Sequence, residues 1–173
     1  MTPEEVEDIF TQGDIRYSGQ YANVVADFFN EKALEIIKED ISGIEIENID
    51  FGKINGPQKS QKAVATKIIF SKGLKLIGYE RDIGHGRVDV LAQNKQNSFI
   101  AVECGPCRLT KLIDYFRWSD LEELWLISIY YNDEKAYFIK RGPNWDKTIK
   151  KYDDARFEQL RKIPNPLDYL NKN

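Results

Sequence analysis

The spacing of hydrophobic residues changes along this chain, and it separates predicted helices from predicted strands. Thr2-Pro3-Glu4-Glu5 resembles a capping box with proline at the first helical position, so it predicts a short helix. Residues 44–49 alternate between hydrophobic and polar and predict a strand, whereas Asn55-Gly56-Pro57 is a break. Between residues 21 and 40 the spacing is helical, with hydrophobic side chains at Val24, Val25, Phe28, Phe29, Leu34, Ile36 and Ile37.

From residue 57 onward the pattern predicts a compact order of helix, three strands, helix and strand. Residues 57–71 have helical spacing, and Gly73 marks the end of that helix. The period then becomes two, with turns at residues 84–86 and 94–97. The three strands separated by these turns cover residues 74–83, 87–93 and 98–104.

The remaining segments complete a predicted α/β protein. Residues 106–116 predict a helix, and the almost continuous hydrophobic run at 124–129 predicts a buried strand. Residues 135–140 pair with that strand through a turn, and residues 145–162 predict a closing helix. The expected architecture is a central mixed sheet flanked by helices.

Two of the predicted strands each carry one acidic residue among hydrophobic ones. These segments are Gly86-Arg87-Val88-Asp89-Val90-Leu91-Ala92 and Ile100-Ala101-Val102-Glu103-Cys104-Gly105. A partly buried carboxylate needs a compensating charge, and two on neighbouring strands suggest a shared cation. Glu80, late in the preceding strand, is a third candidate. Hard oxygen ligands of this kind favour Mg²⁺ or Mn²⁺.

The element order, with Asp89 on the second strand and Glu103 near the end of the third, resembles the PD-(D/E)XK nuclease superfamily. The segments around both acids are especially similar to its archaeal and viral branch, which includes Holliday-junction resolvases. The resemblance covers about residues 57–130 and implies a restriction-endonuclease-like core. It also implies that Asp89 and Glu103 hold a divalent metal ion for DNA cleavage, with a lysine two residues after the glutamate.

The chain departs from that motif in two places. Gly105 occupies the position of the lysine, and Lys111 in the following helix is the expected replacement, with Arg108 second. Helix 57–71 also lacks the acid that many members carry there, and Glu80 is expected to substitute for it. An alternative interpretation is that the two strand acids only form salt bridges, to Arg87 and Arg108.

The net charge of −3 hides an uneven distribution along the chain. Residues 1–50 carry 3 Lys and Arg against 13 Asp and Glu, whereas residues 51–173 carry 22 against 15. We therefore expect an acidic helical extension, 1–50, and a nuclease-like domain, 51–173, that binds DNA. The extension would be a dimerisation arm or a DNA-mimicking cover. The residues expected to contact DNA are Lys59, Lys62, His85, Arg87 and Arg108.

Two other function classes stay open. Cys104-Gly105-Pro106-Cys107 is the sequence of a thioredoxin active site, also placed between a strand and a helix. The surrounding pattern disagrees, because Glu103 replaces the usual tryptophan and the preceding strands predict an antiparallel meander. The second alternative is a catalytically inactive nuclease fold that binds DNA or serves assembly, and Gly105 favours it.

Composition adds few constraints on location and partners. The chain has 31% charged residues, no hydrophobic run of membrane-spanning length and an acidic N-terminal sequence unlike a signal peptide. We expect a cytoplasmic protein without membrane contact that binds DNA, and a homodimer is possible.

Overall fold

The computed structural model describes residues 32–105, 107, 109–130 and 133–161. The helix predicted at Thr2-Pro3-Glu4-Glu5 and residues 21–31 of the next predicted helix lie outside these ranges. The described residues fall into two compact units: residues 35–141 belong to the first, and residues 32–34 and 142–161 to the second. Within the described ranges, none of the helices is both long and apolar enough to span a bilayer.

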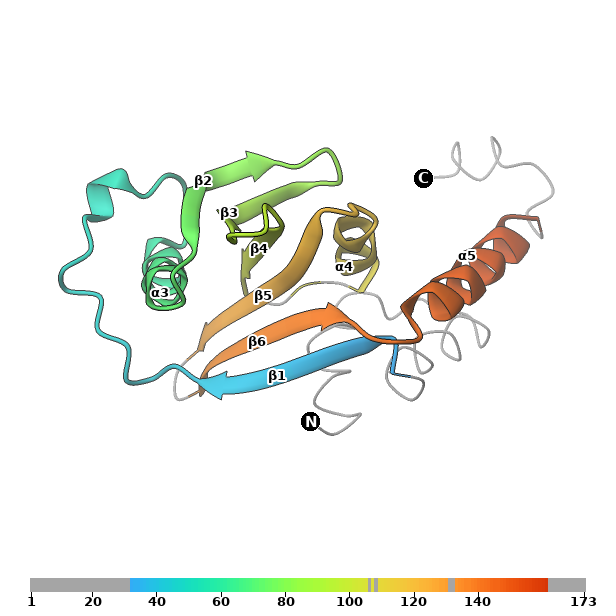
Figure 1. The fold of residues 1–173 in the computed structure, drawn as a ribbon, viewed down its shortest axis with the longest axis horizontal. Coiled ribbons are helices and arrows are strands. Elements are labelled where there is room, and N and C mark those ends of the chain that lie inside the picture. The colour runs from blue at the N-terminus through green and yellow to red at the C-terminus, as the bar shows by residue number, and fades with distance from the viewer. Residues whose placement is uncertain (1–31, 106, 108, 131–132, 162–173) are drawn as a thin grey trace, which may run out of the picture. The chain divides into compact units, whose positions relative to one another are not determined.

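The first unit contains the six-stranded mixed sheet, in the order β1-β6-β5-β4-β3-β2 (Figure 1). Strands β2, β3 and β4 form an antiparallel meander, β4 and β5 are parallel, and β5 and β6 are antiparallel. Helix α4 connects the parallel pair, because parallel neighbours need a crossover connection. The strands are β1 (Leu34–Asp40), β2 (Lys75–Asp82), β3 (Arg87–Gln93), β4 (Phe99–Cys104), β5 (Leu121–Tyr130) and β6 (Asp133–Arg141).

Two helices pack on the sheet. Helix α3 (Lys59–Ser71) buries Val64, Ala65, Ile68 and Ile69 against the face of β3 and β4 that carries Val90 and Val102. Helix α4 (Leu109–Phe116) lies by the other face, where its Tyr115 reaches Glu103 (Figure 1). The core between α3 and the sheet also includes Trp125 and Phe138, whose rings meet edge to face.

The turns of the meander follow from a few residues. Asn94 Oδ1 accepts from the backbone N–H groups of Gln96 and Ser98, which closes the β3–β4 turn. Gly73, at φ +69°, ends α3, and the N–H of Leu74 donates to the carbonyl of Ile69. The prediction of the strands from residue 74 to residue 140, and of the helices between and after them, is confirmed to within a few residues.

Two predicted elements are wrong. Residues 34–40 form strand β1 instead of the end of a helix, since they pair with β6 at one edge of the sheet. Residues 44–49 contain turns rather than a strand, with the N–H of Ile49 donating to the carbonyl of Ile46. Ile44 and Ile46 still pack against the core, which explains their spacing. The domain division at residue 50 stays a prediction.

The second unit includes α5 (Trp145–Arg161) and the described residues 32–34. The N–H of Gly142 donates to the carbonyl of Ala33 at 2.8 Å, and Trp145 is buried. Within the first unit, a short 3₁₀ helix, η1 (Phe51–Lys53), precedes the loop that leads to α3.

Candidate active site

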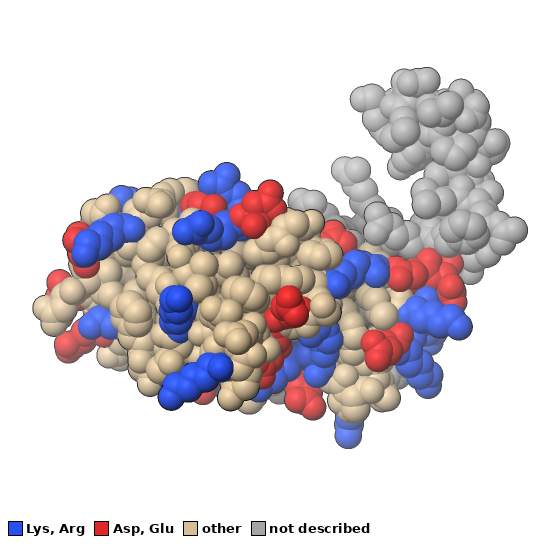
Figure 2. Space-filling model, turned by 45° about the horizontal axis from the view of Figure 1, so that its top comes forward, with Lys and Arg blue, Asp and Glu red and all other residues tan. Residues whose placement is uncertain are grey.

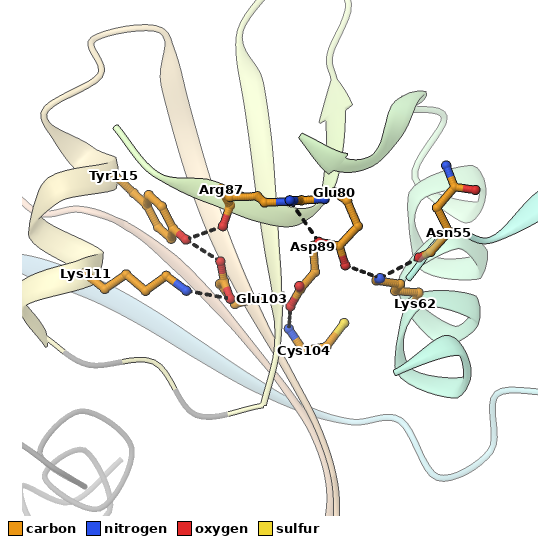
Figure 3. A network of polar contacts seen from close by, with 9 residues as sticks. All are labelled: Asn55, Lys62, Glu80, Arg87, Asp89, Glu103, Cys104, Lys111 and Tyr115. Carbon is orange, nitrogen blue, oxygen red and sulfur yellow. Dashed lines mark hydrogen bonds and ion pairs between the residues drawn. The ribbon is translucent and has the colours of Figure 1, made fainter. Parts of the chain in front are cut away.

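Three acidic residues occupy neighbouring positions across β2, β3 and β4. Tyr79 pairs with Val90 and Arg81 with Val88, which places Glu80 opposite Asp89. Val90 pairs with Val102, and one step further along this register Asp89 lies opposite Glu103. We call Glu80, Asp89 and Glu103 the carboxylate row (Figure 3). The row exists because each acid comes from a neighbouring strand of the same meander.

Asp89, in the middle of the row, is anchored by the backbone of β4. Its Oδ2 accepts a hydrogen bond from the N–H of Cys104 at 2.7 Å. Val88 and Val90, on either side of Asp89, are both fully buried on the opposite face of the strand. The alternation of the strand therefore holds Asp89 on the face that Glu103 shares.

Glu103 is the most buried member of the row, with 7% of its surface exposed. Its Oε1 accepts from the hydroxyl of Tyr115 at 2.5 Å, and its Oε2 lies 3.4 Å from the ammonium of Lys111. Burial raises the pKa of Glu103 to about 7, and the charge of Asp89 adds to this effect while Tyr115 and Lys111 oppose it.

Tyr115 joins Glu103 to the neighbouring strand. Its hydroxyl also lies 2.8 Å from the carbonyl oxygen of Arg87, so two acceptors share one phenolic proton. When Glu103 is protonated, it can donate to the hydroxyl oxygen of Tyr115, and the hydroxyl proton of Tyr115 is then available for the carbonyl of Arg87. Burial, followed by the charge of Glu103, raises the pKa of Tyr115, so the phenol remains a donor at neutral pH.

Glu80, at the other end of the row, is paired with two cations. Its Oε1 lies 2.5 Å from Nζ of Lys62, and its Oε2 lies 3.1 Å from Nε of Arg87. The hydrogen bond from Lys62 lowers the pKa of Glu80, which burial opposes and the charges of Lys62 and Arg87 reinforce. Lys62 also donates to the carbonyl of Asn55 at 2.6 Å.

The other predicted DNA contacts lie in different surroundings. His85 is exposed in the β2–β3 turn, and Arg87 is exposed just after it. Lys59 is exposed at the start of α3, where its Nζ lies 3.4 Å from the carbonyl of Phe51. Lys62 is completely buried, so it cannot follow a phosphate backbone on the surface as predicted. Arg108 lies outside the described residues.

Tyr115, Asn55 and the burial of Lys62 were not anticipated by the sequence analysis. For Tyr115 a signal existed, because it follows Lys111 by four residues and therefore shares its helix face. The ammonium of Lys111 lies 5.6 Å from the centre of the Tyr115 ring. The other two come from a loop and a helix whose placement against the sheet no local pattern specifies.

The cysteines are in an environment unlike that of a reactive thiol. Neither Cys104 nor Cys107 forms a disulfide, and both are buried. Burial raises the pKa of Cys104, and the charge of Asp89 raises it further. A nucleophilic thiol needs the opposite shift. The strands before Cys104 also form an antiparallel meander, as the sequence predicted.

The donor set of the row fits a hard cation held partly by water. Among the described residues, no group of three or more His, Cys, Asp and Glu side chains is arranged to hold a metal ion. Mg²⁺, however, commonly takes only one or two protein carboxylates, together with waters and substrate phosphates. Asp89 and Glu103, adjacent on one face, can supply such a pair, whereas Glu80 is already engaged by two cations.

Comparisons of the chain with protein-family models, with curated proteins and with solved structures gave no significant match.

Proposed function

We propose that this protein is a divalent-metal-dependent nuclease that hydrolyses phosphodiester bonds in DNA. The observation that carries the proposal is the pair Asp89 and Glu103, adjacent across two antiparallel strands, with the ammonium of Lys111 at 3.4 Å from Glu103. Such an arrangement suits phosphodiester hydrolysis, because two carboxylates can hold a metal ion and an ammonium group can stabilise negative charge on the phosphate.

The topology supports the same proposal. Helix α3, strands β2, β3 and β4, helix α4 and strand β5 follow one another in the order that the PD-(D/E)XK resemblance implies. Asp89 lies within the second of these strands and Glu103 next to the end of the third. We therefore infer a restriction-endonuclease-like core for the first unit.

Gly105 explains how this chain would depart from the usual motif. Its φ is +114°, a conformation that a lysine adopts only with strain, and its N–H donates to the carbonyl of Ile127. The cation would then come from α4, where Lys111 has 47% of its side chain exposed and already faces Glu103. In this proposal Lys111 is the functional replacement for the missing lysine.

The roles of the residues follow from their positions. Asp89 and Glu103 would hold Mg²⁺ or Mn²⁺, which supplies Lewis-acid chemistry and lowers the pKa of a bound water. Lys111 would stabilise the charge that develops on the phosphate. Tyr115 would orient Glu103 through Oε1. Figure 2 shows positive and negative side chains interspersed on the displayed face.

A second candidate is a nuclease fold that binds DNA without cutting it. Both oxygens of Glu103 have partners, Tyr115 and Lys111, so this carboxylate is satisfied without a metal ion. In that case the site would be a structural salt-bridge network. The presence of a homodimer and a cytoplasmic location also remain predictions.

Cleavage assays separate the two candidates. The protein should cut single-stranded, duplex or branched DNA with Mg²⁺ or Mn²⁺ and not with EDTA. Asp89→Asn should abolish cleavage while leaving the thermal melting curve in EDTA close to that of the wild type. Absence of cleavage on all three substrates, together with no stabilisation by Mn²⁺, would favour the non-catalytic candidate.

A further inference from the structure

We propose that Glu80 does not bind the metal ion, but together with buried Lys62 positions the guanidinium of Arg87 for a phosphate group of the nucleic acid. This inference rests on the proposed function and adds a substrate-binding subsite to it. It also separates the three acids of the carboxylate row into two roles. Asp89 and Glu103 form the metal pair, and Glu80 belongs to a cation-binding end of the row (Figure 3).

The backbone of Glu80 is the first observation. Its φ is +51° near the end of β2, a left-handed conformation that is unfavourable for a residue with a side chain. The preceding residue, Tyr79, faces α3 and its hydroxyl bonds that of Thr66. The unusual backbone allows Glu80 to reach Lys62 of the same helix, even though its strand position lies opposite Asp89.

The loop before α3 closes over the pair that results. Gly56, at φ +75°, lies so near that a Cβ there would be 2.7 Å from Oε1 of Glu80 and 2.9 Å from Nζ of Lys62. The neighbouring Asn55 supplies its carbonyl to Lys62. Loop, helix and strand therefore hold this ion pair from three sides.

One carboxylate oxygen of Glu80 is occupied by its ion pair with Lys62. None of the surface of Lys62 is exposed, and its only charged partner among the described residues is Glu80. Removing the carboxylate from a buried ammonium is strongly destabilising, because the charge is left without compensation. A metal ion at Oε1 would have to displace this partner. Glu80 is thus better suited to hold cationic side chains than to hold a divalent ion.

Arg87 is paired with the other oxygen of Glu80. Its side chain is 66% exposed, and its Nε lies 3.1 Å from Oε2 of Glu80. Arg87 lies two residues before Asp89 and so shares its strand face. A guanidinium binds phosphate through its fork of N–H groups, and a fixed Nε leaves the terminal nitrogens for that purpose.

The direction in which Glu80→Gln changes DNA affinity tests whether Glu80 positions Arg87. Glu80→Gln removes a negative charge beside the DNA, so an electrostatic effect alone would strengthen DNA binding. Loss of positioning would weaken it instead. We expect Glu80→Gln and Arg87→Gln each to weaken binding of a labelled duplex oligonucleotide in EDTA, by roughly tenfold for Arg87→Gln, with its salt slope reduced by about 1.

Coupling between the two positions gives a second test. If Glu80 acts through Arg87, the double variant should bind DNA about as weakly as Arg87→Gln alone. Calorimetric titration with Mn²⁺ alone should give dissociation constants for both single variants within about twofold of wild type, a difference of less than ~0.5 kcal/mol. Asp89→Asn is the positive control, and it should lose Mn²⁺ binding.

Three outcomes would overturn the inference: stronger DNA binding by Glu80→Gln, additive losses in the double variant, or a tenfold weaker Mn²⁺ affinity in Glu80→Gln. If Glu80→Gln does not fold, Lys62→Met combined with Glu80→Met removes both charges of the pair at similar volume. That variant should bind DNA like Arg87→Gln and bind Mn²⁺ like wild type. Failure of wild type to bind Mn²⁺ would refute the proposed function, while the DNA measurements in EDTA would still test the Glu80–Arg87 coupling.

Discussion

At the scale of single residues, Lys111 is the group on which the proposed chemistry depends most directly. Its ammonium is partly exposed and within 3.4 Å of Glu103, so truncation removes charge without opening a cavity in the core. Lys111→Ala should lower the cleavage rate by ~10²–10³, the scale for losing one electrostatic donor. The measurement is single-turnover cleavage, with DNA affinity measured separately in EDTA and expected to change little.

Lys95→Ala is the matched control for that variant. Lys95 is an exposed lysine in the β3–β4 turn, at the opposite end of these strands from the metal pair. Its truncation should leave the rate unchanged. If Lys111→Ala and Lys95→Ala cleave equally fast, Lys111 is not the replacement for the missing lysine.

Gly105 gives a complementary prediction. Restoring the usual motif with Gly105→Lys places a side chain at φ +114° and should destabilise the protein by about 1–3 kcal/mol. It should not raise the cleavage rate, because Lys111 already supplies the cation. Chemical denaturation and the same cleavage assay test both parts. A stable variant that cuts faster would show that glycine here is not required by the backbone.

Glu103 predicts how stability depends on pH without metal. Its pKa rises from 4.5 in the unfolded chain to about 7 in the folded protein, so the folded state binds the extra proton between these values. The contribution is fully present below pH 4.5 and is lost as the pH rises through about 7. The loss is roughly 3 kcal/mol at ~1.4 kcal/mol per pH unit.

Glu103→Gln isolates this contribution because glutamine does not titrate. In EDTA, the free energy of unfolding of wild type should fall relative to that of Glu103→Gln between about pH 5 and about pH 8. Denaturation curves at the two pH values give the difference. Parallel behaviour of the two proteins would show that Glu103 is ionised throughout that range.

The sequence predicted that Asp89 and Glu103 lie next to each other, but it did not predict the contacts that Tyr115 and Lys62 make with the row. Asp89 and Glu103 were expected together because consecutive strands usually pair, and their strand period puts both on one face. Tyr115 and Lys62 come from helices on opposite faces of the sheet. How each helix rotates about its axis is decided by packing, so a local pattern does not identify which of its polar residues meets the row.

At the scale of elements, Arg141 at the end of β6 closes the connection between α4 and β5. Its guanidinium donates to the carbonyl oxygens of Phe116, Trp118 and Leu121, and it lies 5.0 Å from the centre of the Phe116 ring. Phe116 is the last residue of α4, where backbone carbonyls lack partners within the helix. The side chain of Arg141 therefore supplies hydrogen-bond donors to three backbone carbonyls in the connection between the parallel strands β4 and β5.

Arg141→Met should reduce the free energy of unfolding by about 3 kcal/mol, because several carbonyls lose a charged donor. Lys140→Met is the control on the adjacent residue, whose ammonium lies 3.7 Å from Glu123 and is about half exposed. A surface pair of this kind contributes little, so its loss should cost less than ~1 kcal/mol. Equal losses in the two variants would contradict this role of Arg141.

The elements that the sequence predicted correctly share a clear local signal. The meander strands have a period of two and are separated by glycine and asparagine turns, which specify pairing between neighbours. Strand β1 lacks such a signal, because its partner β6 lies far along the chain and its hydrophobic residues also fit a helix. Residues 44–49 alternate as a strand does, but they pair with no strand, and Ile44 and Ile46 contact the core from an irregular segment.

At the scale of the whole molecule, the two cysteines distinguish the proposed class from an oxidoreductase. Both side chains are buried, and Cys104 contributes its backbone N–H, not its thiol, to Asp89. Cys104→Ser combined with Cys107→Ser should therefore retain metal-dependent cleavage, with roughly 1–3 kcal/mol lost for the buried hydroxyls. Wild type should show no disulfide reductase activity with insulin. Such activity, lost in the double variant, would favour the thioredoxin-like alternative.

The continuity of the meander has a consequence for how the protein folds. All three acids of the carboxylate row lie between residues 80 and 103, so short loop closures bring them together early. The cations that compensate them include Lys62 and Lys111, which arrive only when α3 and α4 dock on opposite faces. Of the three cations that contact the row, Arg87 alone belongs to the meander, so repulsion between the acids weakens the hairpins until the helices dock. We therefore expect the meander and its two helices to fold as one cooperative step, in which charge neutralisation and packing occur together.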